Sequence, residues 1–210
     1  KLLPSAVFLT EEDTIENTDG QLQWIIDPLD GTTNFLHNLP CFSISVALRY
    51  EEELVMGVVH EVNENESFYA WKDGGAFLNG KPIHVTTTST FSETLIGTGF
   101  PYYDYSKIPP FIATLEYLMQ HTRGIRRFGS AAVDLAYVAC GRFDGFFEYS
   151  LNSWDVAAGI VLVQEAGGVV RDFKETNDFL FGGEIVATNA KIAEEFSAMI
   201  GFYFYPKEEK

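Results

Sequence analysis

Apolar residues in the first half of the chain occur in short runs separated by polar and turn-forming residues. Residues 7–9 and 22–26 form two such runs, each leading into acidic residues, and predict short buried strands. Closely spaced segments rich in β-branched and aromatic residues predict an antiparallel meander over residues 42–50, 54–60 and 67–71. Asn79 and Gly80, which lie between two short apolar pairs, predict a hairpin turn after the meander.

In the second half, the spacing of apolar residues changes to that of helices. It predicts helices over residues 110–122, 130–140, 153–166 and 191–200. Ser130 and Ser153 are the expected N-caps of the second and third helices, and Gly141 is expected to end the second. Strand-like runs lie between the helices, at residues 143–149, 169–173 and 185–188. Strands that first come in runs and then alternate with helices favour a layered sandwich of the α+β or α/β class.

The composition indicates a packed protein with an acidic surface. The chain has 210 residues, 46% of them hydrophobic and 15% aromatic, which is enough for one large domain or two small ones with a sizeable core. Its formal net charge is -16. Such a charge argues against nucleic acid and anionic membrane as partners, because both require a basic surface. It does not argue against phosphorylated substrates, because bound metal ions supply positive charge locally.

The cysteines and the apolar stretches indicate where the protein resides. Cys41 and Cys140 are the only cysteines, lie far apart and lack metal-type spacing, so buried free thiols are expected. No apolar stretch approaches the roughly 20 residues of a membrane span. The first residues do not show the pattern of a signal peptide. A soluble, cytoplasmic protein is expected.

Residues 27–32, Asp-Pro-Leu-Asp-Gly-Thr, place two carboxylates three positions apart. Pro28 biases Asp27 toward an extended strand end. A tight turn here is predicted to aim both carboxylates and the Leu29 carbonyl at one point, which suits a hard divalent cation. The alternative is that these aspartates are ordinary turn and cap residues. The spacing fits neither an EF-hand loop nor the aspartate pair of haloacid dehalogenases.

A helix is predicted to begin directly after this turn. Gly31 permits close approach of the backbone to a ligand. Either Thr32 or Thr33 is expected to cap the helix. Free N–H groups at a helix start attract phosphate oxygens, so the sequence predicts a phosphate site beside the cation site.

Two other acidic elements have an ordinary explanation when each is taken alone. Residues 11–13, Glu-Glu-Asp, follow the first predicted strand and read as a solvated charge run. Asp155 falls in the first turn of a predicted helix, where the helix dipole favours a carboxylate. Trp154 beside it is most simply a core residue.

Taken together and in this order, these segments resemble the inositol monophosphatase family of lithium-sensitive, magnesium-dependent phosphatases. Residues 24–35 (WIIDPLDGTTNF) match the first family signature, and residues 154–168 (WDVAAG…EAGG) match the second. Residues 75–80 and 129–132 are also similar to family blocks, and Glu11 and Glu12 lie where the family carries an upstream metal-binding glutamate. The resemblance covers nearly the whole chain.

The resemblance implies a fold and a domain organisation. It implies alternating α-β-α-β-α layers, as in fructose-1,6-bisphosphatase and inositol monophosphatase, with the N-terminal helical part absent from this chain. Residues 1–210 would form a single catalytic domain with two sub-lobes, roughly 1–120 and 121–210. Family members are often dimers, so a homodimer is expected.

The resemblance also implies a role for individual residues. A first Mg²⁺ would be held by Glu11, Asp27 and the Leu29 carbonyl, and a second by Asp27, Asp30 and Asp155. The implied catalytic residues are Glu11, Thr32 and Asp30, with the Thr32 hydroxyl and Glu11 orienting and helping to deprotonate the attacking water. The implied substrate contacts are Asp30, Gly31, Thr32, Ala131, Glu148 and Asp155. Two or three Mg²⁺ ions are the expected cofactor, and Mn²⁺ is the expected substitute.

The leading hypothesis is Mg²⁺-dependent hydrolysis of a small phosphorylated molecule, with myo-inositol monophosphate as the first choice. A nucleotide 3′-phosphatase is an alternative that needs a base-stacking platform. A fructose-1,6-bisphosphatase is another, and it needs a basic pocket for a distal phosphate. Arg126 and Arg127 either face such a phosphate or face solvent, and Asn152 is a weak candidate for contact with the leaving group. A non-catalytic homologue that binds a divalent metal or a phosphate ligand is the alternative of another class.

Overall fold

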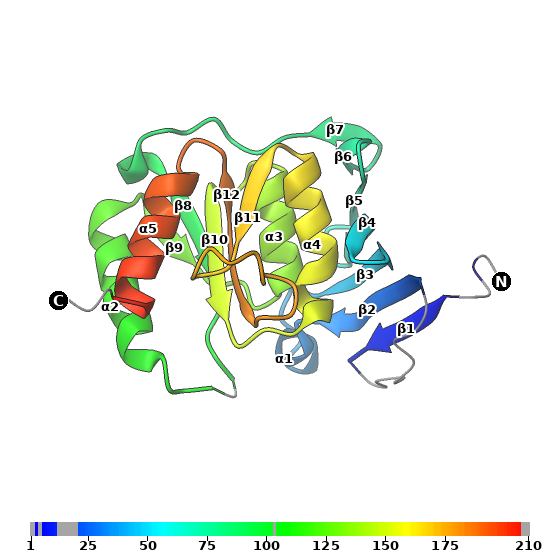
Figure 1. Cartoon of the computed structure of the whole chain (residues 1–210), viewed down its shortest axis with the longest axis horizontal. Coiled ribbons are helices and arrows are strands. Elements are labelled where there is room, and N and C mark those ends of the chain that lie inside the picture. The colour runs from blue at the N-terminus through cyan, green and yellow to red at the C-terminus, as the bar shows by residue number, and fades with distance from the viewer. Residues whose placement is uncertain (1–2, 4–5, 12–20, 103, 207–210) are drawn as a thin grey trace.

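The computed structural model of the chain describes residues 3, 6–11, 21–102 and 104–206. Within these residues the strands form two sheets, one of seven strands in the order β1-β2-β3-β4-β5-β6-β7 and one of five in the order β11-β12-β10-β8-β9. Figure 1 shows that helices α3 and α4 lie between the two sheets, while α2 and α5 cover the far side of the five-stranded sheet. The described part of the chain is therefore a β-α-β-α sandwich, in agreement with the predicted α/β layering.

The seven-stranded sheet follows the order of the sequence. Its strands are β1 (Val7–Thr10), β2 (Leu22–Asp30), β3 (Ser43–Tyr50), β4 (Glu53–Glu61), β5 (Glu66–Trp71), β6 (Gly75–Leu78) and β7 (Lys81–Ile83). Strand β1 pairs with β2 in parallel, and every later neighbour pairs antiparallel, which confirms the predicted meander. Asn79 and Gly80 adopt φ angles of 48° and 82° between β6 and β7, which confirms the hairpin turn.

The second half of the chain supplies most of the other elements. The remaining strands are β8 (Leu95–Thr98), β9 (Gly124–Arg126), β10 (Gly145–Tyr149), β11 (Gly168–Arg171) and β12 (Glu184–Asn189). The helices are α1 (Thr32–Leu36), α2 (Ile108–His121), α3 (Ala131–Ala139), α4 (Ser153–Glu165) and α5 (Ala193–Phe204), with a short 3₁₀ turn at Phe91–Glu93. No helix of the described residues is both long and apolar enough to cross a membrane.

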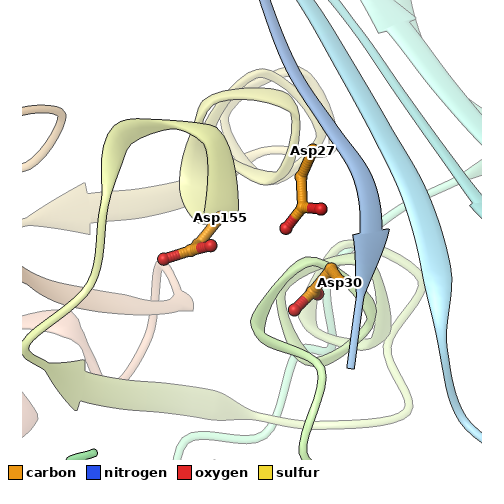
Figure 2. A group of neighbouring side chains, drawn as sticks. All are labelled: Asp27, Asp30 and Asp155. Carbon is orange, nitrogen blue, oxygen red and sulfur yellow. The ribbon is translucent and has the colours of Figure 1, made fainter. Parts of the chain in front are cut away.

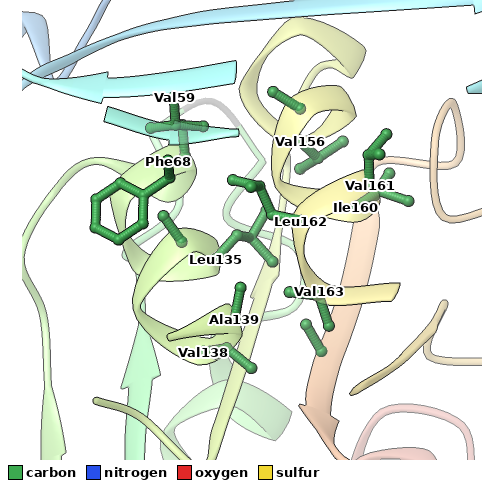
Figure 3. Packing of buried hydrophobic residues seen from close by; sticks show 14 of the residues in the cluster. Val59, Phe68, Leu135, Val138, Ala139, Val156, Ile160, Val161, Leu162 and Val163 are labelled. Carbon is green, nitrogen blue, oxygen red and sulfur yellow. The ribbon is translucent and has the colours of Figure 1, made fainter. Parts of the chain in front are cut away.

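Helix α4 is buried on nearly all sides because it lies in the middle layer. Nine of its residues, from Ser153 to Val163, are buried, so its sequence lacks the polar face of a surface helix. Figure 3 shows Leu162 of α4 beside Leu135 of α3, with Val59 and Phe68 of the seven-stranded sheet close by. A second core, rich in phenylalanine, fills the space between the five-stranded sheet and helices α2 and α5.

The structure corrects several predictions about local elements. Asn152, not Ser153, is the N-cap of α4, because Ser153 already has helical geometry. Helix α5 spans Ala193–Phe204 and so runs four residues beyond its predicted end. The short strands β8 and β9 were not predicted, because they are held by parallel pairing with segments distant in sequence rather than by a local pattern. The division into sub-lobes near residue 120 stays a prediction.

Cys41 and Cys140 are free and partly buried, as expected from their number and spacing. Burial raises the pKa of the Cys140 thiol. It raises the pKa of the Cys41 thiol as well. Both thiols are therefore expected to stay protonated and unreactive at neutral pH.

We predict that Gly57→Ala destabilises the fold. A Cβ atom at Gly57 in β4 would lie 2.5 Å from the Ala158 carbonyl oxygen of α4, a backbone atom that cannot move away without shifting the helix. We expect a loss of about 2–3 kcal/mol in the free energy of unfolding, or about 5–10 °C in melting temperature. Gly124→Ala in β9 is the matched control, because its nearest contact would be an arginine tip at 3.4 Å. Equal stability of the two variants would contradict the prediction.

Candidate active site

Three carboxylates converge where strand β2 meets the start of helix α4. One oxygen atom from each of Asp27, Asp30 and Asp155 lies within 4.8 Å of the other two. Figure 2 shows the three side chains pointing toward a common centre, two from β2 and one from the first turn of α4. Segments more than a hundred residues apart in the sequence thus supply a single acidic cluster.

A bulge in β2, rather than the predicted tight turn, sets the direction of Asp27 and Asp30. Asp27 pairs with Ser45 and Asp30 with Ser43, so three steps along β2 match two steps along β3. The Leu29 N–H donates to Asp27 Oδ1 at 2.8 Å and fixes that carboxylate. An extra residue in the strand therefore brings both aspartates to the same side of the sheet end.

Helix α3 holds the second carboxylate through its N-terminus. Ser130 Oγ donates to Asp30 Oδ2 at 2.5 Å, and the Ala132 N–H donates to the same oxygen at 2.8 Å. Ser130 also accepts a hydrogen bond from the Val133 N–H at 3.3 Å, which confirms its predicted role as N-cap of α3. The same serine therefore starts the helix and orients a carboxylate of the cluster.

The third carboxylate is fixed by the N-terminus of its own helix. Asp155 Oδ2 accepts a hydrogen bond from the Asn152 N–H at 2.7 Å. The helix dipole favours a negative charge in this first turn, as expected from the sequence.

Gly31 separates the carboxylate strand from helix α1. It has φ 89° and a Cβ atom there would lie 3.0 Å from the Cys41 carbonyl oxygen, so only glycine fits without strain. Gly31 is itself the N-cap of α1, which corrects the expectation that Thr32 or Thr33 would cap this helix. The Thr32 hydroxyl instead donates to the Leu29 carbonyl at 2.9 Å. Asn34 anchors the short helix by donating from Nδ2 to the Cys41 and Phe128 carbonyls at 2.8 and 2.7 Å.

Burial and mutual repulsion make the three carboxylates weak acids. Desolvation, with added repulsion from Asp30, raises the pKa of Asp27 to about 8. Desolvation, then repulsion from Asp30, raises the pKa of Asp155 to about 7. Desolvation raises the pKa of Asp30 only to about 6, because hydrogen bonds from Ser130 and Ala132 favour the charged form. The folded protein thus concentrates negative charge that a cation would neutralise.

The cluster opens into a pocket of about 190 Å³. All the residues to which the family resemblance gives a metal-binding, catalytic or substrate-binding role line this pocket. Those residues are Glu11, Asp27, Leu29, Asp30, Gly31, Thr32, Ala131, Glu148 and Asp155. Glu11 is exposed and lies on the pocket wall rather than within the close triad. Its neighbours Glu12 and Asp13 lie outside the described residues. Asn152 also lines the pocket, as its weak sequence signal suggested.

The far wall of the pocket carries residues that the sequence did not single out. Gly99 and Tyr102 lie on the segment after β8, and Ser150 and Leu151 lie on the segment after β10. Nothing in their local sequence marks them, because they reach the pocket only through the parallel pairing of β8 with β10. Arg127 joins them in the pocket wall, whereas Arg126 is exposed and bonds a carbonyl of its own strand.

A buried pair of acids includes one residue of the pocket wall, Glu148. Glu148 is 8% exposed and Asp134 of α3 is 1% exposed. Desolvation raises the pKa of Glu148 well above its usual range, and Asp30 and Asp155 add repulsion. Desolvation likewise raises the pKa of Asp134, with repulsion from Glu148 next. Arg127 is the nearby cation that opposes both shifts.

The donor set of the cluster fits a hard divalent cation. All of its atoms are carboxylate oxygens, with the Leu29 carbonyl and Glu11 on the same pocket wall. Oxygen-only sites suit Mg²⁺, Mn²⁺ or Ca²⁺ and are poor sites for softer metals. The raised pKa values of Asp27, Asp30 and Asp155 are the second reason, because three clustered carboxylates repel one another when they are ionised without a cation.

Comparison with known proteins agrees with the fold. A model described as the inositol monophosphatase family matches residues 1–200. The chain therefore belongs to the inositol monophosphatase family, whose members hydrolyse phosphate monoesters.

The chain is similar to several bacterial members of this family. It is 45% identical over 201 residues to the inositol-1-monophosphatase of Rhizobium meliloti, covering 95% of this chain and 76% of that protein. It is 43% identical over 199 residues to the Nus factor SuhB of Escherichia coli, covering 94% and 74%. The structure of inositol monophosphatase from Anabaena superposes with a TM-score of 0.89 at 39% identity, covering 95% of this chain and 79% of that one.

We predict that the metal-free protein loses stability as the pH rises. The pKa of Asp27 is about 8 in the folded state, against about 4 in an unfolded chain. Between these two values the carboxylate keeps its proton in the folded state but loses it in the unfolded chain. The contribution of Asp27 to stability is therefore fully present below about pH 4 and is lost as the pH rises to about 8. Millimolar Mg²⁺ should raise the melting temperature most at pH 8, because it binds the ionised cluster.

Asp27→Asn tests this prediction by thermal denaturation after treatment with a chelator. The variant lacks the ionisable group, so it should exceed the wild-type melting temperature at pH 8 without metal and gain less from Mg²⁺. Glu195→Gln, in the exposed first turn of α5, is the control and should follow the wild type. An unchanged wild-type melting temperature on adding Mg²⁺ at pH 8 would contradict a metal site.

Proposed function

We propose that this protein hydrolyses a phosphate monoester in a Mg²⁺-dependent reaction, with myo-inositol monophosphate as the preferred substrate. The observation that carries the proposal is the convergence of Asp27, Asp30 and Asp155 within 4.8 Å in a pocket of a chain from this family. Hydrolysis of phosphate monoesters is among the slowest uncatalysed reactions, and its catalysis relies on positioning and neutralisation of charge. A pocket with clustered carboxylates suits that task only if it binds cations.

The metal ligands we propose are those that line the acidic end of the pocket. Glu11, Asp27 and the Leu29 carbonyl would hold a first Mg²⁺, and Asp27, Asp30 and Asp155 a second. When bound, these ions neutralise phosphate charge, lower the pKa of water and stabilise the leaving oxygen. The Thr32–Leu29 hydrogen bond supports this arrangement, since it fixes a hydroxyl and a carbonyl on the same wall.

The chain's own residues would orient the other reactants. The Thr32 hydroxyl and the Glu11 carboxylate would hold the attacking water, which Glu11 helps to deprotonate. Main-chain N–H groups of Gly31 and Thr32 would contact phosphate oxygens at the start of α1. Gly31 and Thr32 both line the pocket, which supports this contact.

The part of the pocket around Glu148 would bind the leaving group. Glu148 would accept hydrogen bonds from ring hydroxyls, with Ala131, Asp30 and Asp155 beside it. Glu148 lines the pocket although it is nearly buried, which supports this contact. Asn152 is proposed as a further contact for the leaving group.

Arg127 favours a second candidate, a fructose-1,6-bisphosphatase. Its guanidinium donates to the Tyr102 hydroxyl and lies 5.3 Å from the Phe100 ring centroid. It lines the pocket, so the sequence alternative in which it faces only solvent is disfavoured. A cation held between two aromatic rings at this position would suit a distal phosphate.

A substrate panel separates these candidates. We expect phosphate release with Mg²⁺ to be fastest from myo-inositol monophosphate, compared with fructose 1,6-bisphosphate and adenosine 3′,5′-bisphosphate. For fructose 1,6-bisphosphate, Arg127→Met should then change kcat/KM by less than about threefold, whereas a true distal phosphate contact would cost tenfold or more (about 1.4 kcal/mol). No release from any substrate in the presence of Mg²⁺ would favour the non-catalytic binding protein.

Asp155→Asn should lower kcat by about 10²–10⁴-fold, because the amide retains the size of the side chain but not its charge. Phosphate release at saturating Mg²⁺ measures the loss. Glu195→Gln is the matched control, since it removes a carboxylate from the first turn of another helix. A loss below about tenfold (roughly 1.4 kcal/mol) would rule out Asp155 as a metal ligand.

A further inference from the structure

Gly99 is a residue of the pocket wall that lies against the carboxylate of Glu148. A Cβ atom built on Gly99 would lie 1.9 Å from Glu148 Oε1, 2.0 Å from Cδ and 2.1 Å from Oε2. The space that a side chain would need at residue 99 is thus already taken by the Glu148 carboxylate. Gly99 is buried, and its φ angle is not in the left-handed region, so its backbone conformation does not require glycine.

The pairing of two strands explains why these residues meet. Strand β8 pairs in parallel with β10, and the last pair is Thr98 with Phe147. One residue further, Gly99 lies beside Glu148, and side chains at paired positions of adjacent strands point to the same face of a sheet. Thr98 Oγ1 donates to the Phe147 carbonyl at 2.9 Å and fixes this register at the pocket edge.

We propose that Gly99 is a specificity-determining position, because its missing side chain sets where the Glu148 carboxylate stands in the pocket. The inference rests on the proposed function, in which Glu148 binds hydroxyl groups of the leaving group. In this proposal Gly99 acts through Glu148, so it is a positioning residue. Its effect is expected on discrimination among leaving groups rather than on cation binding by the carboxylate cluster.

The kind of atom that Gly99 contacts makes this position different from other tight glycines. At Gly57 an added Cβ meets the backbone of α4, and at Gly97 it meets the buried rings of Phe143 and Phe146. At Gly99 it meets the free end of a flexible side chain, which can rotate away at small cost to the fold. Gly99→Ala therefore separates function from stability, because the carboxylate moves while the backbone remains in place.

The test compares two substrates in the Mg²⁺-loaded enzyme. Myo-inositol monophosphate offers ring hydroxyls to Glu148, whereas p-nitrophenyl phosphate offers none. We expect Gly99→Ala to lower kcat/KM for inositol monophosphate about tenfold, mainly through KM, and to change that for p-nitrophenyl phosphate less than about threefold. The melting temperature should stay within about 2 °C of the wild type, unlike that of Gly57→Ala.

Double variants show whether Gly99 acts through Glu148. In the Glu148→Ala background, Gly99→Ala should have no further effect on the ratio of the two kcat/KM values. Glu148→Asp shortens the side chain by one methylene and so leaves room for a Cβ atom at residue 99. The double variant Gly99→Ala with Glu148→Asp should therefore lose less kcat/KM for inositol monophosphate than the product of the two single losses. An equal loss on both substrates, or a full additional loss in the Glu148→Ala background, would overturn the proposal.

Failure of the proposed function is distinguishable from failure of this inference. If the wild type does not hydrolyse inositol monophosphate, the substrate assignment fails, and the comparison is repeated with the best hydroxyl-bearing substrate of the panel. A crystal structure of Gly99→Ala gives a readout independent of activity. A Glu148 carboxylate displaced from the pocket supports the inference, and one left in place with the loop shifted instead overturns it.

Discussion

The two hydrogen bonds that α3 donates to Asp30 are the contact on which the geometry of the site depends. Ser130 Oγ and the Ala132 N–H join the end of β2 to the start of a helix in the middle layer. Helix α4, which carries Asp155, packs closely along α3, since a Cβ atom at Gly159 would lie 2.5 Å from Leu135 Cβ. Two contacts therefore set the distance between the carboxylates of β2 and that of α4. They are the hydrogen bonds from α3 to Asp30 and the close packing of α4 on α3.

Burial of acidic side chains near the site lowers the stability of the fold. The chain has a net charge of -16, and burial of Asp27, Glu148 and Asp134 adds desolvation to repulsion. The packed middle layer provides the opposing free energy, because α3 and α4 bury apolar side chains against both sheets. Active sites commonly keep such locally unfavourable groups, and the surrounding core compensates for them.

The sequence was sufficient for elements with strong local patterns and for the acidic residues in a recognisable order. The meander, the Asn79–Gly80 turn and the Ser130 cap all follow from nearby residues alone, and the structure confirms them. Taken singly, Asp27, Asp30 and Asp155 also fit roles as turn, cap or helix-start residues. Only their combination in this order predicted a metal site. The family was recognisable because the spacing of its motifs is preserved over nearly the whole chain.

Features that arise from pairing between distant segments could not be predicted. The bulge between Asp27 and Asp30 looked like a tight turn, because Pro28 and Gly31 are typical turn residues, and only the pairing with β3 shows otherwise. The strands β8 and β9 are three or four residues long, too short for a periodic signal. Gly99 and Tyr102 line the pocket through that same pairing, so no local pattern marks them.

Strand β1 stands at the edge of its sheet and pairs only with β2 among the described strands. Its four paired positions, Val7 to Thr10, are what bring Glu11 to the pocket wall. Asp27, Asp30 and Asp155 are each held by backbone N–H groups, whereas Glu11 depends on this short edge strand. Fraying of β1 would thus remove one carboxylate and leave the other three in place. The order of an edge strand would then control how many cation ligands the pocket offers.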